Sequence, residues 1–213
     1  GSEMCIRDRS RQAAVVSVQM NFPKLILIDP GHGEDDPGMI GVDGLEEKGI
    51  NLAISLLLKS ELETRGYSVV MTRETDKGLY DASANNKKAQ DMQRRIAMIG
   101  EKSPVLSVSI HQNSYPDPAI KGAQVFYHKS SEKGKRLAGI LQQSIKEKAD
   151  KENHRVEKAN DSYYMLRKVS CPIVIVECGF LSNPDEERLL NDEKYQKKVV
   201  EGIADGIENF LYK

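Results

Sequence analysis

The chain has 213 residues, which is enough for one ordinary globular domain or two very small ones. It carries 31 Lys and Arg against 32 Asp and Glu, and this net charge of −1 provides no overall field that attracts nucleic acid or an anionic membrane. Trp is absent and there are only four Phe and eight Tyr, which argues against the aromatic platforms that stack bases or sugars. No apolar run approaches the roughly 20 residues of a membrane span.

The first 20 residues differ from the rest of the chain. They begin with Gly-Ser, which is typical of an expression-vector remnant, and show no apolar periodicity. We therefore expect residues 1–20 to be a disordered leader, tag or other non-native segment. We also expect that a native export signal or anchor is missing from this sequence. No repeat or linker divides the remainder, which predicts one domain over residues 21–213.

Short apolar runs alternate with helical patterns along this domain. In chain order, the predicted strands are 25–28, 68–72, 105–110, 124–127 and 173–176. The predicted helices, which have a period of 3.6 residues, are 51–64, 88–99, 132–148 and 193–211. This alternation predicts an α/β domain with a mostly parallel, twisted sheet of about six strands and helices on both faces.

Three of the predicted strands stop abruptly at polar residues. His32 follows the first strand, His111 follows the third, and Glu177 follows the apolar run 173–176. Because ligands bind beyond the carboxyl ends of the strands in an open α/β sheet, these side chains would meet in one cleft if the strands are parallel neighbours.

Two imidazoles and a carboxylate can hold zinc, whose catalytic sites often have three protein ligands and an open position for water. The loop after His32 offers several carboxylates as the third ligand: Glu34, Asp35, Asp36, Asp43, Glu46 and Glu47. Glu46 and Glu47 are favoured because they directly precede the predicted helix, and the residues alone do not choose between them.

Simpler interpretations exist for the same residues. Either histidine taken alone could be a hydrogen-bonded structural residue, and Glu177 could be a salt-bridge partner. His128 and His154 lie in Lys-rich surroundings and are predicted to be solvated. Cys178 is predicted to be a buried thiol rather than a nucleophile.

The chain resembles the zinc-dependent N-acetylmuramoyl-L-alanine amidases of the Amidase_3 family. The resemblance covers about residues 24–211 and rests on segments 29–33 (DPGHG), 36–38 (DPG), 47–48 with 51–52, 71–73 (MTR), Arg95 with Ala97, 109–113 (SIHQN), 122–123 with 126–127, 164–167 (YMLR), and 176–183 (VECGFLSN) with Glu186 and 189–190. Two departures are small: Glu34 and the pair 49–50 differ from common family residues, and neither is an expected ligand.

The resemblance implies that His32, Glu47 and His111 bind Zn²⁺ and that Glu177 is the catalytic carboxylate. It also implies hydrolysis of the amide between N-acetylmuramic acid and L-alanine in peptidoglycan. Segment 88–99 and the compact chain are similar to the spore-cortex amidases of Gram-positive spore formers. An extracytoplasmic location, in the cell wall or spore envelope, and a possible activating partner protein follow as expectations.

Four residues are candidates for contacts to substrate or to the ligands. Asp29 could orient an imidazole or cap the loop, and Asn113 could bind substrate or fix the loop of His111. Arg73 and Arg95 could meet substrate carboxylates, although pairing with local acids is favoured. Two other functions remain as alternatives: a zinc carboxypeptidase acting on stem peptides, and an inactive wall-binding scaffold that kept the fold.

Overall fold

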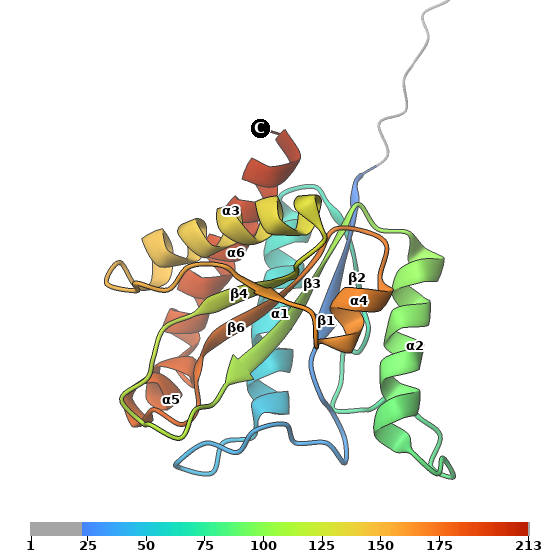
Figure 1. Ribbon diagram of the computed structural model, residues 1–213, viewed down its shortest axis with the longest axis horizontal. Coiled ribbons are helices and arrows are strands. Elements are labelled where there is room, and N and C mark those ends of the chain that lie inside the picture. Colours follow the sequence, from blue (N-terminus) through green and yellow to red (C-terminus); the bar gives the residue numbers. More distant parts are fainter. Residues whose placement is uncertain (1–22, 213) are drawn as a thin grey trace, which may run out of the picture.

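A six-stranded sheet forms the centre of the protein in a computed structural model, which describes residues 23–212 (Figure 1). The strands are β1 (Leu25–Pro30), β2 (Ser68–Met71), β3 (Leu106–Asn113), β4 (Gln124–His128), β5 (Lys158–Asn160) and β6 (Ile173–Phe180). The helices are α1 (Glu47–Thr64), α2 (Lys87–Lys102), α3 (Glu132–Ala149), α4 (Tyr164–Lys168), α5 (Pro184–Leu190) and α6 (Glu193–Tyr212). The expectation for residues 1–20 concerns residues outside the described part of the chain.

The strands are arranged in the order β2-β1-β3-β6-β4-β5. All neighbours are parallel except β4 and β6, which are antiparallel. The predicted α/β fold with a mostly parallel sheet of about six strands is therefore confirmed. Because β1, β3 and β6 are consecutive parallel neighbours, their carboxyl ends lie at one edge of the sheet.

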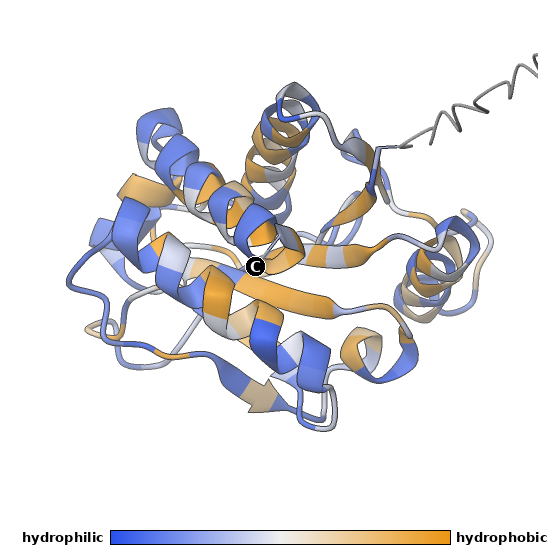
Figure 2. Ribbon diagram, turned by 90° about the horizontal axis from the view of Figure 1, so that it is seen from above, coloured by the Kyte–Doolittle hydropathy of each residue, from blue (hydrophilic) through white to orange (hydrophobic). Residues whose placement is uncertain are grey.

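The two faces of the sheet are covered unequally. Side chains alternate between the faces along each strand, so Ile26 and Ile28 pack with helices α1, α3 and α6 in the larger apolar cluster. Leu27 points to the other face, where the smaller cluster includes Ile99 of α2 and Met165 of α4. Figure 2 shows apolar strands enclosed by helices whose outward surfaces are hydrophilic. The α4 helix has only five residues, so the face that it shares with α2 is less completely covered.

The sequence did not predict three short elements. Strand β5 has the polar sequence Lys-Ala-Asn, and α4 and α5 have five and seven residues, too few to show a helical period. Within residues 23–212, no helix is long and apolar enough to cross a membrane.

Candidate metal centre

His32 lies in the turn that follows β1. Its backbone has a φ of 62°, a left-handed conformation that is uncommon for residues other than glycine. The ring nitrogen Nδ1 lies 2.8 Å from Oδ2 of Asp36, and Nε2 lies 3.2 Å from Oε2 of Glu47. The contact with Asp36 leaves Nε2 directed toward Glu47. A strained backbone of this kind persists only where the surrounding structure holds it, and it is frequent at functional sites.

Glu47 is the first residue of α1 and is almost completely buried, with 2% of its surface exposed. Its carboxylate accepts hydrogen bonds from the backbone N–H groups of Met39 (2.8 Å) and Gln112 (3.0 Å) and from Nδ2 of Asn51 (3.1 Å). Burial alone would raise the pKa of Glu47, but the hydrogen bonds and charges of His111 and His32 lower it well below its usual value. The side chain is therefore a carboxylate held in one orientation.

His111 comes from the end of β3, and its Nδ1 lies 3.0 Å from Oε1 of Glu47. The rings of His32 and His111 are nearly perpendicular, with centroids 5.1 Å apart. The imidazole of His111 packs directly over Gly31, where a Cβ atom would lie 2.2 Å from its Cε1 atom. Glycine at position 31 is thus required for this placement of the ring.

His32, Glu47 and His111 each offer one ligand atom, and these atoms all lie within 4.8 Å of one another. Two imidazole nitrogens and a carboxylate oxygen are a donor set that suits zinc. The contact of His32 with Asp36 is also typical of metal sites, because a ligating histidine usually donates its second N–H to a carboxylate or carbonyl. Burial alone would lower the pKa of His32, but Glu47 and Asp36 raise it to about 8. The donor set and the contact with Asp36, rather than this pKa, fit a divalent metal ion.

Glu177 lies beside His111, because the two are register partners on the parallel strands β6 and β3. Register partners point to the same face of a sheet, which places both side chains on the face shared by α2 and α4. The Glu177 side chain is buried: Oε1 lies 3.4 Å from the hydroxyl of Tyr163, and Oε2 has no hydrogen-bond partner among residues 23–212. Burial raises the pKa of Glu177 to about 7, and the charge of Glu47 adds to this effect, although His111 opposes it.

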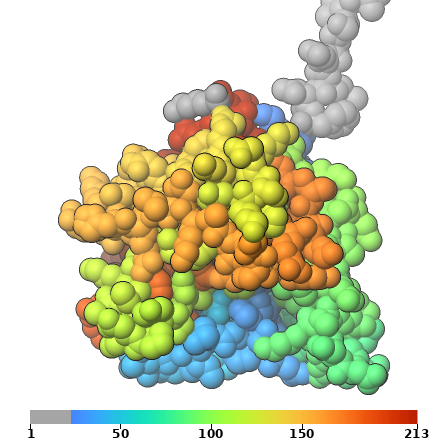
Figure 3. Space-filling view, viewed as in Figure 1, coloured from blue at the N-terminus to red at the C-terminus, as the bar shows by residue number. Residues whose placement is uncertain are grey.

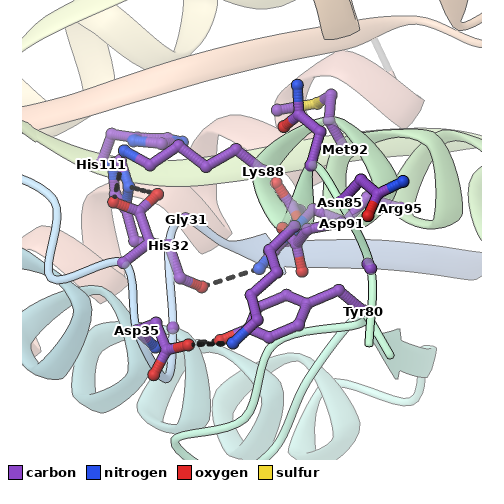
Figure 4. Close-up of a pocket in the computed structure, with 16 residues that line it drawn as sticks. Gly31, His32, Asp35, Tyr80, Asn85, Lys88, Asp91, Met92, Arg95 and His111 are labelled. Atoms are coloured by element: carbon purple, nitrogen blue, oxygen red, sulfur yellow. Dashed lines mark hydrogen bonds and ion pairs between the residues drawn. The ribbon is translucent and has the colours of Figure 1, made fainter. Parts of the chain in front are cut away.

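A cavity of about 710 Å³ adjoins this group of residues, between the loop after β1 and helix α2. Figure 3 shows the recess between the blue segment after β1, the green α2 and the orange segment that contains α4. Figure 4 shows His32 and His111 at one side of the cavity, with Lys88 of α2 reaching toward them. The Nζ atom of Lys88 lies 3.0 Å from Oδ1 of Asp36.

Asp29 and Arg95 lie beneath the site and form a buried ion pair. Arg95 Nη1 donates to Oδ1 of Asp29 (2.8 Å), and the hydroxyls of Thr72 and Ser109 donate to the same carboxylate, each at 2.6 Å. Burial alone would raise the pKa of Asp29, but Arg95 and these hydroxyls lower it to about 2. Asp29 touches neither imidazole, so the suggestion that it orients one is wrong: Asp36 has that position. These contacts do not support its other suggested role, as a cap of the loop, because none of them comes from a backbone N–H group.

The two buried arginines hold the backbone that carries His32. Nη2 of Arg95 donates to the carbonyl of His32 (2.7 Å), and Nη2 of Arg73 donates to the carbonyl of Gly31 (2.8 Å). Burial and the neighbouring Arg95 lower the pKa of Arg73 to about 10. Arg95 pairs with local acids, Asp29 and Asp91, whereas Arg73 donates to backbone carbonyls and pairs with no acid among the described residues. Asn113 is partly exposed, and its Oδ1 accepts from the N–H of Ser114 within the same loop.

The remaining candidates lie away from this group. His154 is exposed, and Nδ1 of His128 lies 2.8 Å from the hydroxyl of Ser130. Cys178 is a buried free thiol on the opposite face of the sheet.

Four residues that support the site had no role predicted from the sequence: Asn51, Gln112, Tyr163 and Glu187. Asn51 is one helical turn after Glu47, a spacing that brings side chains together and that could have revealed it. Glu187, which is fully buried, accepts from the N–H groups of Asp43 (2.8 Å) and Leu45 (3.3 Å) and so fixes the loop before Glu47. Tyr163 and Glu187 reach the site from distant parts of the chain, and no local pattern marks them.

Comparisons with known proteins relate the whole described domain to one family. The family model described as N-acetylmuramoyl-L-alanine amidase (Amidase_3) matches residues 26–209. The chain is 33% identical over 191 residues to the germination-specific N-acetylmuramoyl-L-alanine amidase of Bacillus subtilis (strain 168), covering 88% of this chain and 80% of the relative. The solved structure of the CwlD amidase from Clostridioides difficile in complex with the GerS lipoprotein is 39% identical, with a TM-score of 0.86 over 88% of this chain and 98% of that one. An N-acetylmuramoyl-L-alanine amidase from Clostridium difficile 630 is 29% identical, with a TM-score of 0.79 over 89% and 97% of the two chains.

Proposed function

The chain belongs to the Amidase_3 family of N-acetylmuramoyl-L-alanine amidases, and on that premise we propose how its residues carry out the reaction. It is a hydrolase that acts on peptidoglycan. The proposal is that His32, Glu47 and His111 hold Zn²⁺ and that Glu177 moves the proton during hydrolysis of the amide between N-acetylmuramic acid and L-alanine. The observation that carries it is the placement of three donor atoms within 4.8 Å of one another, beside a buried carboxylate oxygen that has no hydrogen-bond partner in the described part of the chain.

When bound, zinc would polarise the scissile carbonyl and lower the pKa of a water molecule to about 7. The protein's own contribution begins with orientation. Asp36 fixes the His32 ring through Nδ1, and the N–H groups of Met39 and Gln112 fix the carboxylate of Glu47. A ligand group held in this way needs little rearrangement when the metal binds.

Glu177 is proposed to act as general base and then as general acid. Its carboxylate takes a proton from the attacking water and delivers it to the nitrogen of the leaving L-alanine. A pKa raised to about 7 suits both steps, because proton transfer is most effective when the pKa of the group lies near the working pH. The hydroxyl of Tyr163, whose pKa burial and the charge of Glu177 raise to about 12, stays protonated and donates to Oε1 of Glu177.

Digestion of purified peptidoglycan by the zinc-loaded protein, with and without a chelator, tests this proposal. Mass spectrometry of the products should show whole stem peptides with a free L-alanine amino terminus, and the chelator should abolish them. Release of single terminal residues would instead indicate a carboxypeptidase. Binding to the wall without any product would indicate a scaffold.

We also propose that the chain acts outside the cytoplasm, on cell wall or spore cortex. A role in spores is supported by the relative that is named as germination-specific. The CwlD amidase was solved in complex with the GerS lipoprotein. The same complex supports the proposal that a partner protein activates this chain. Such a partner would raise the rate of cleavage above that of the isolated chain, and equal rates with and without it would contradict this proposal.

A further inference from the structure

A second, smaller cavity of about 100 Å³ lies beside Glu177 on the face of the sheet that α2 and α4 cover. Ser109 and Ile175 form its floor on β3 and β6, and Met92 of α2 faces it from one side. The other walls come from the segment that enters α4, namely Tyr163, Tyr164 and Met165. His111 and Glu177 follow Ser109 and Ile175 by two residues on the same strands, so they border the cavity at the carboxyl edge of the sheet.

The lining of this cavity suits an apolar group. Met92, Met165, Ile175 and the two tyrosine rings supply most of it. Two hydroxyls of the lining are engaged in hydrogen bonds: that of Ser109 donates to Asp29 at 2.6 Å, and that of Tyr163 contacts Glu177, whose carboxylate lies at the border of the cavity. A volume of about 100 Å³ is smaller than the roughly 150 Å³ of an apolar cavity that holds benzene, so it has room for a small aliphatic side chain and too little for an aromatic one.

The cavity also adjoins the larger one beside the metal centre. Met92 and His111, both labelled in Figure 4, line both cavities. The two cavities therefore lie next to each other and share these two side chains as part of their walls.

We propose that this cavity receives the methyl side chain of L-alanine and so selects the first residue of the stem peptide. The proposal rests on the function proposed above. Glu177 borders the cavity and delivers its proton to the leaving nitrogen, and the Cα atom of L-alanine is bonded to that nitrogen. The alanine methyl is thus the apolar group that lies two bonds from the atom that Glu177 must reach. The lactyl methyl of the muramic acid lies on the acyl side of the bond.

A panel of synthetic muramoyl peptides tests the assignment. The zinc-loaded protein is given substrates that carry glycine, L-alanine or L-leucine at the first position. Loss of one buried methyl should lower kcat/KM for the glycine substrate by roughly 4-fold or more, and leucine should be a poorer substrate still because it overfills the cavity.

Met92→Ala widens the cavity and should raise the ratio of kcat/KM for leucine over alanine by roughly 5-fold or more. Ile96→Ala is the matched control, because Ile96 is also half-buried on α2 but lines a different pocket. The control should keep the wild-type ratio. These ratios do not depend on the fraction of protein that is folded or loaded with zinc.

Equal kcat/KM values for the glycine and alanine substrates, or equal changes of the ratio in the two variants, would overturn the proposal. A substrate that lacks the lactyl methyl gives a further test. If wild type cleaves it with a lower kcat/KM and Met92→Ala does not show this loss, the cavity holds the lactyl methyl and the proposal is wrong.

Calorimetric binding of free stem peptides that begin with L-alanine or glycine provides a readout independent of turnover. The protein could hydrolyse no muramoyl peptide and still bind the alanine peptide more tightly than the glycine peptide. If Met92→Ala then lost this preference, the proposed function would be refuted and the assignment of the cavity would stand. Equal binding of the two peptides by an inactive protein would refute both.

Discussion

Substitution of Arg95 by methionine tests the buried support of the metal centre. The guanidinium of Arg95 donates to the carboxylate of Asp29 at 2.8 Å and to the carbonyl of His32 at 2.7 Å. Its side chain is 2% exposed and that of Asp29 is 1% exposed, so water does not replace these contacts when the guanidinium is removed. The variant leaves a carboxylate buried without its charge partner.

The expected loss of stability is large. Breaking a buried ion pair by removing one partner costs about 3–5 kcal/mol, against a total stability of about 5–15 kcal/mol for an ordinary protein. In a chain of 213 residues, 1 kcal/mol corresponds to a change in Tm of about 2–4 °C, so Arg95→Met should lower Tm by roughly 6–20 °C. Removal of the bond to the His32 carbonyl should also weaken zinc binding.

Thermal or urea unfolding measures the loss, and the adjacent residue provides a control. Arg94 pairs with Asp81 at the surface, where their side chains are 44% and 59% exposed, so Arg94→Met should cost at most about 1 kcal/mol. In the double variant Asp29→Asn, Arg95→Met the buried charge is gone, and stability should exceed that of Arg95→Met alone. A loss below about 1 kcal/mol in the single variant, or a double variant no more stable than it, would refute the reasoning.

Three further predictions concern the same region. Asp36→Ala should weaken zinc binding by roughly 10–100-fold in a chelator competition, since Asp36 orients a ligand histidine, and an unchanged affinity would contradict this role. Gly31→Ala should lower zinc content, because its Cβ would lie 2.2 Å from the ring of His111. The control Gly100→Ala, with open space around position 100, should keep zinc and stabilise α2 by about 0.5–1 kcal/mol. Full zinc occupancy in Gly31→Ala would show that the ring has room to move. The pKa of Asp29 is about 2 when folded and 3.8 when unperturbed, so this group contributes about 2 kcal/mol above pH about 4, and the contribution is lost as the pH falls toward 2. The stability gap between wild type and Asp29→Asn should shrink over that range in acid titrations, and a constant gap would contradict the sign.

The strands that carry the site were predictable because they are buried on both faces. The runs 25–28 and 173–176 are continuous and apolar, the run 105–110 carries Ser107 and Ser109 among its apolar residues, and each run is followed by a polar residue near the carboxyl end of its strand. The rule that carboxyl ends of parallel strands meet at one edge then brought His32, His111 and Glu177 together. These inferences need only local sequence and the general topology of α/β sheets.

The choice of the acidic residue that serves as the third proposed metal ligand needed more than local sequence. Reasoning from the residues left Glu46 and Glu47 open, and the family resemblance favoured Glu47. In the structure, Glu47 is buried as the first residue of α1, whereas the side chain of Glu46 is 49% exposed and lies near Lys48. Which of two adjacent carboxylates turns inward depends on where the helix begins, and such boundaries are uncertain by a residue or two from sequence alone.

Other features depend on contacts between distant segments. The antiparallel direction of β4 and the short α4 and α5 leave no periodic signal, because their few residues are held by tertiary packing. Asp29 and Asp36 are equally plausible partners for an imidazole in the sequence. The structure separates them because Arg95, from a helix more than 60 residues away in the chain, takes up the carboxylate of Asp29.

The most direct test of the proposed chemistry measures zinc content and peptidoglycan cleavage on the same samples of wild type and Glu177→Gln. Both proteins should contain one zinc ion per chain, since Glu177 is not among the proposed ligands. Wild type should release stem peptides that begin with L-alanine, and Glu177→Gln should be slower by roughly 10²–10⁴-fold, the usual contribution of a general acid–base. Wild-type rates in the variant, or cleavage by wild type that persists after its zinc has been removed, would contradict the account.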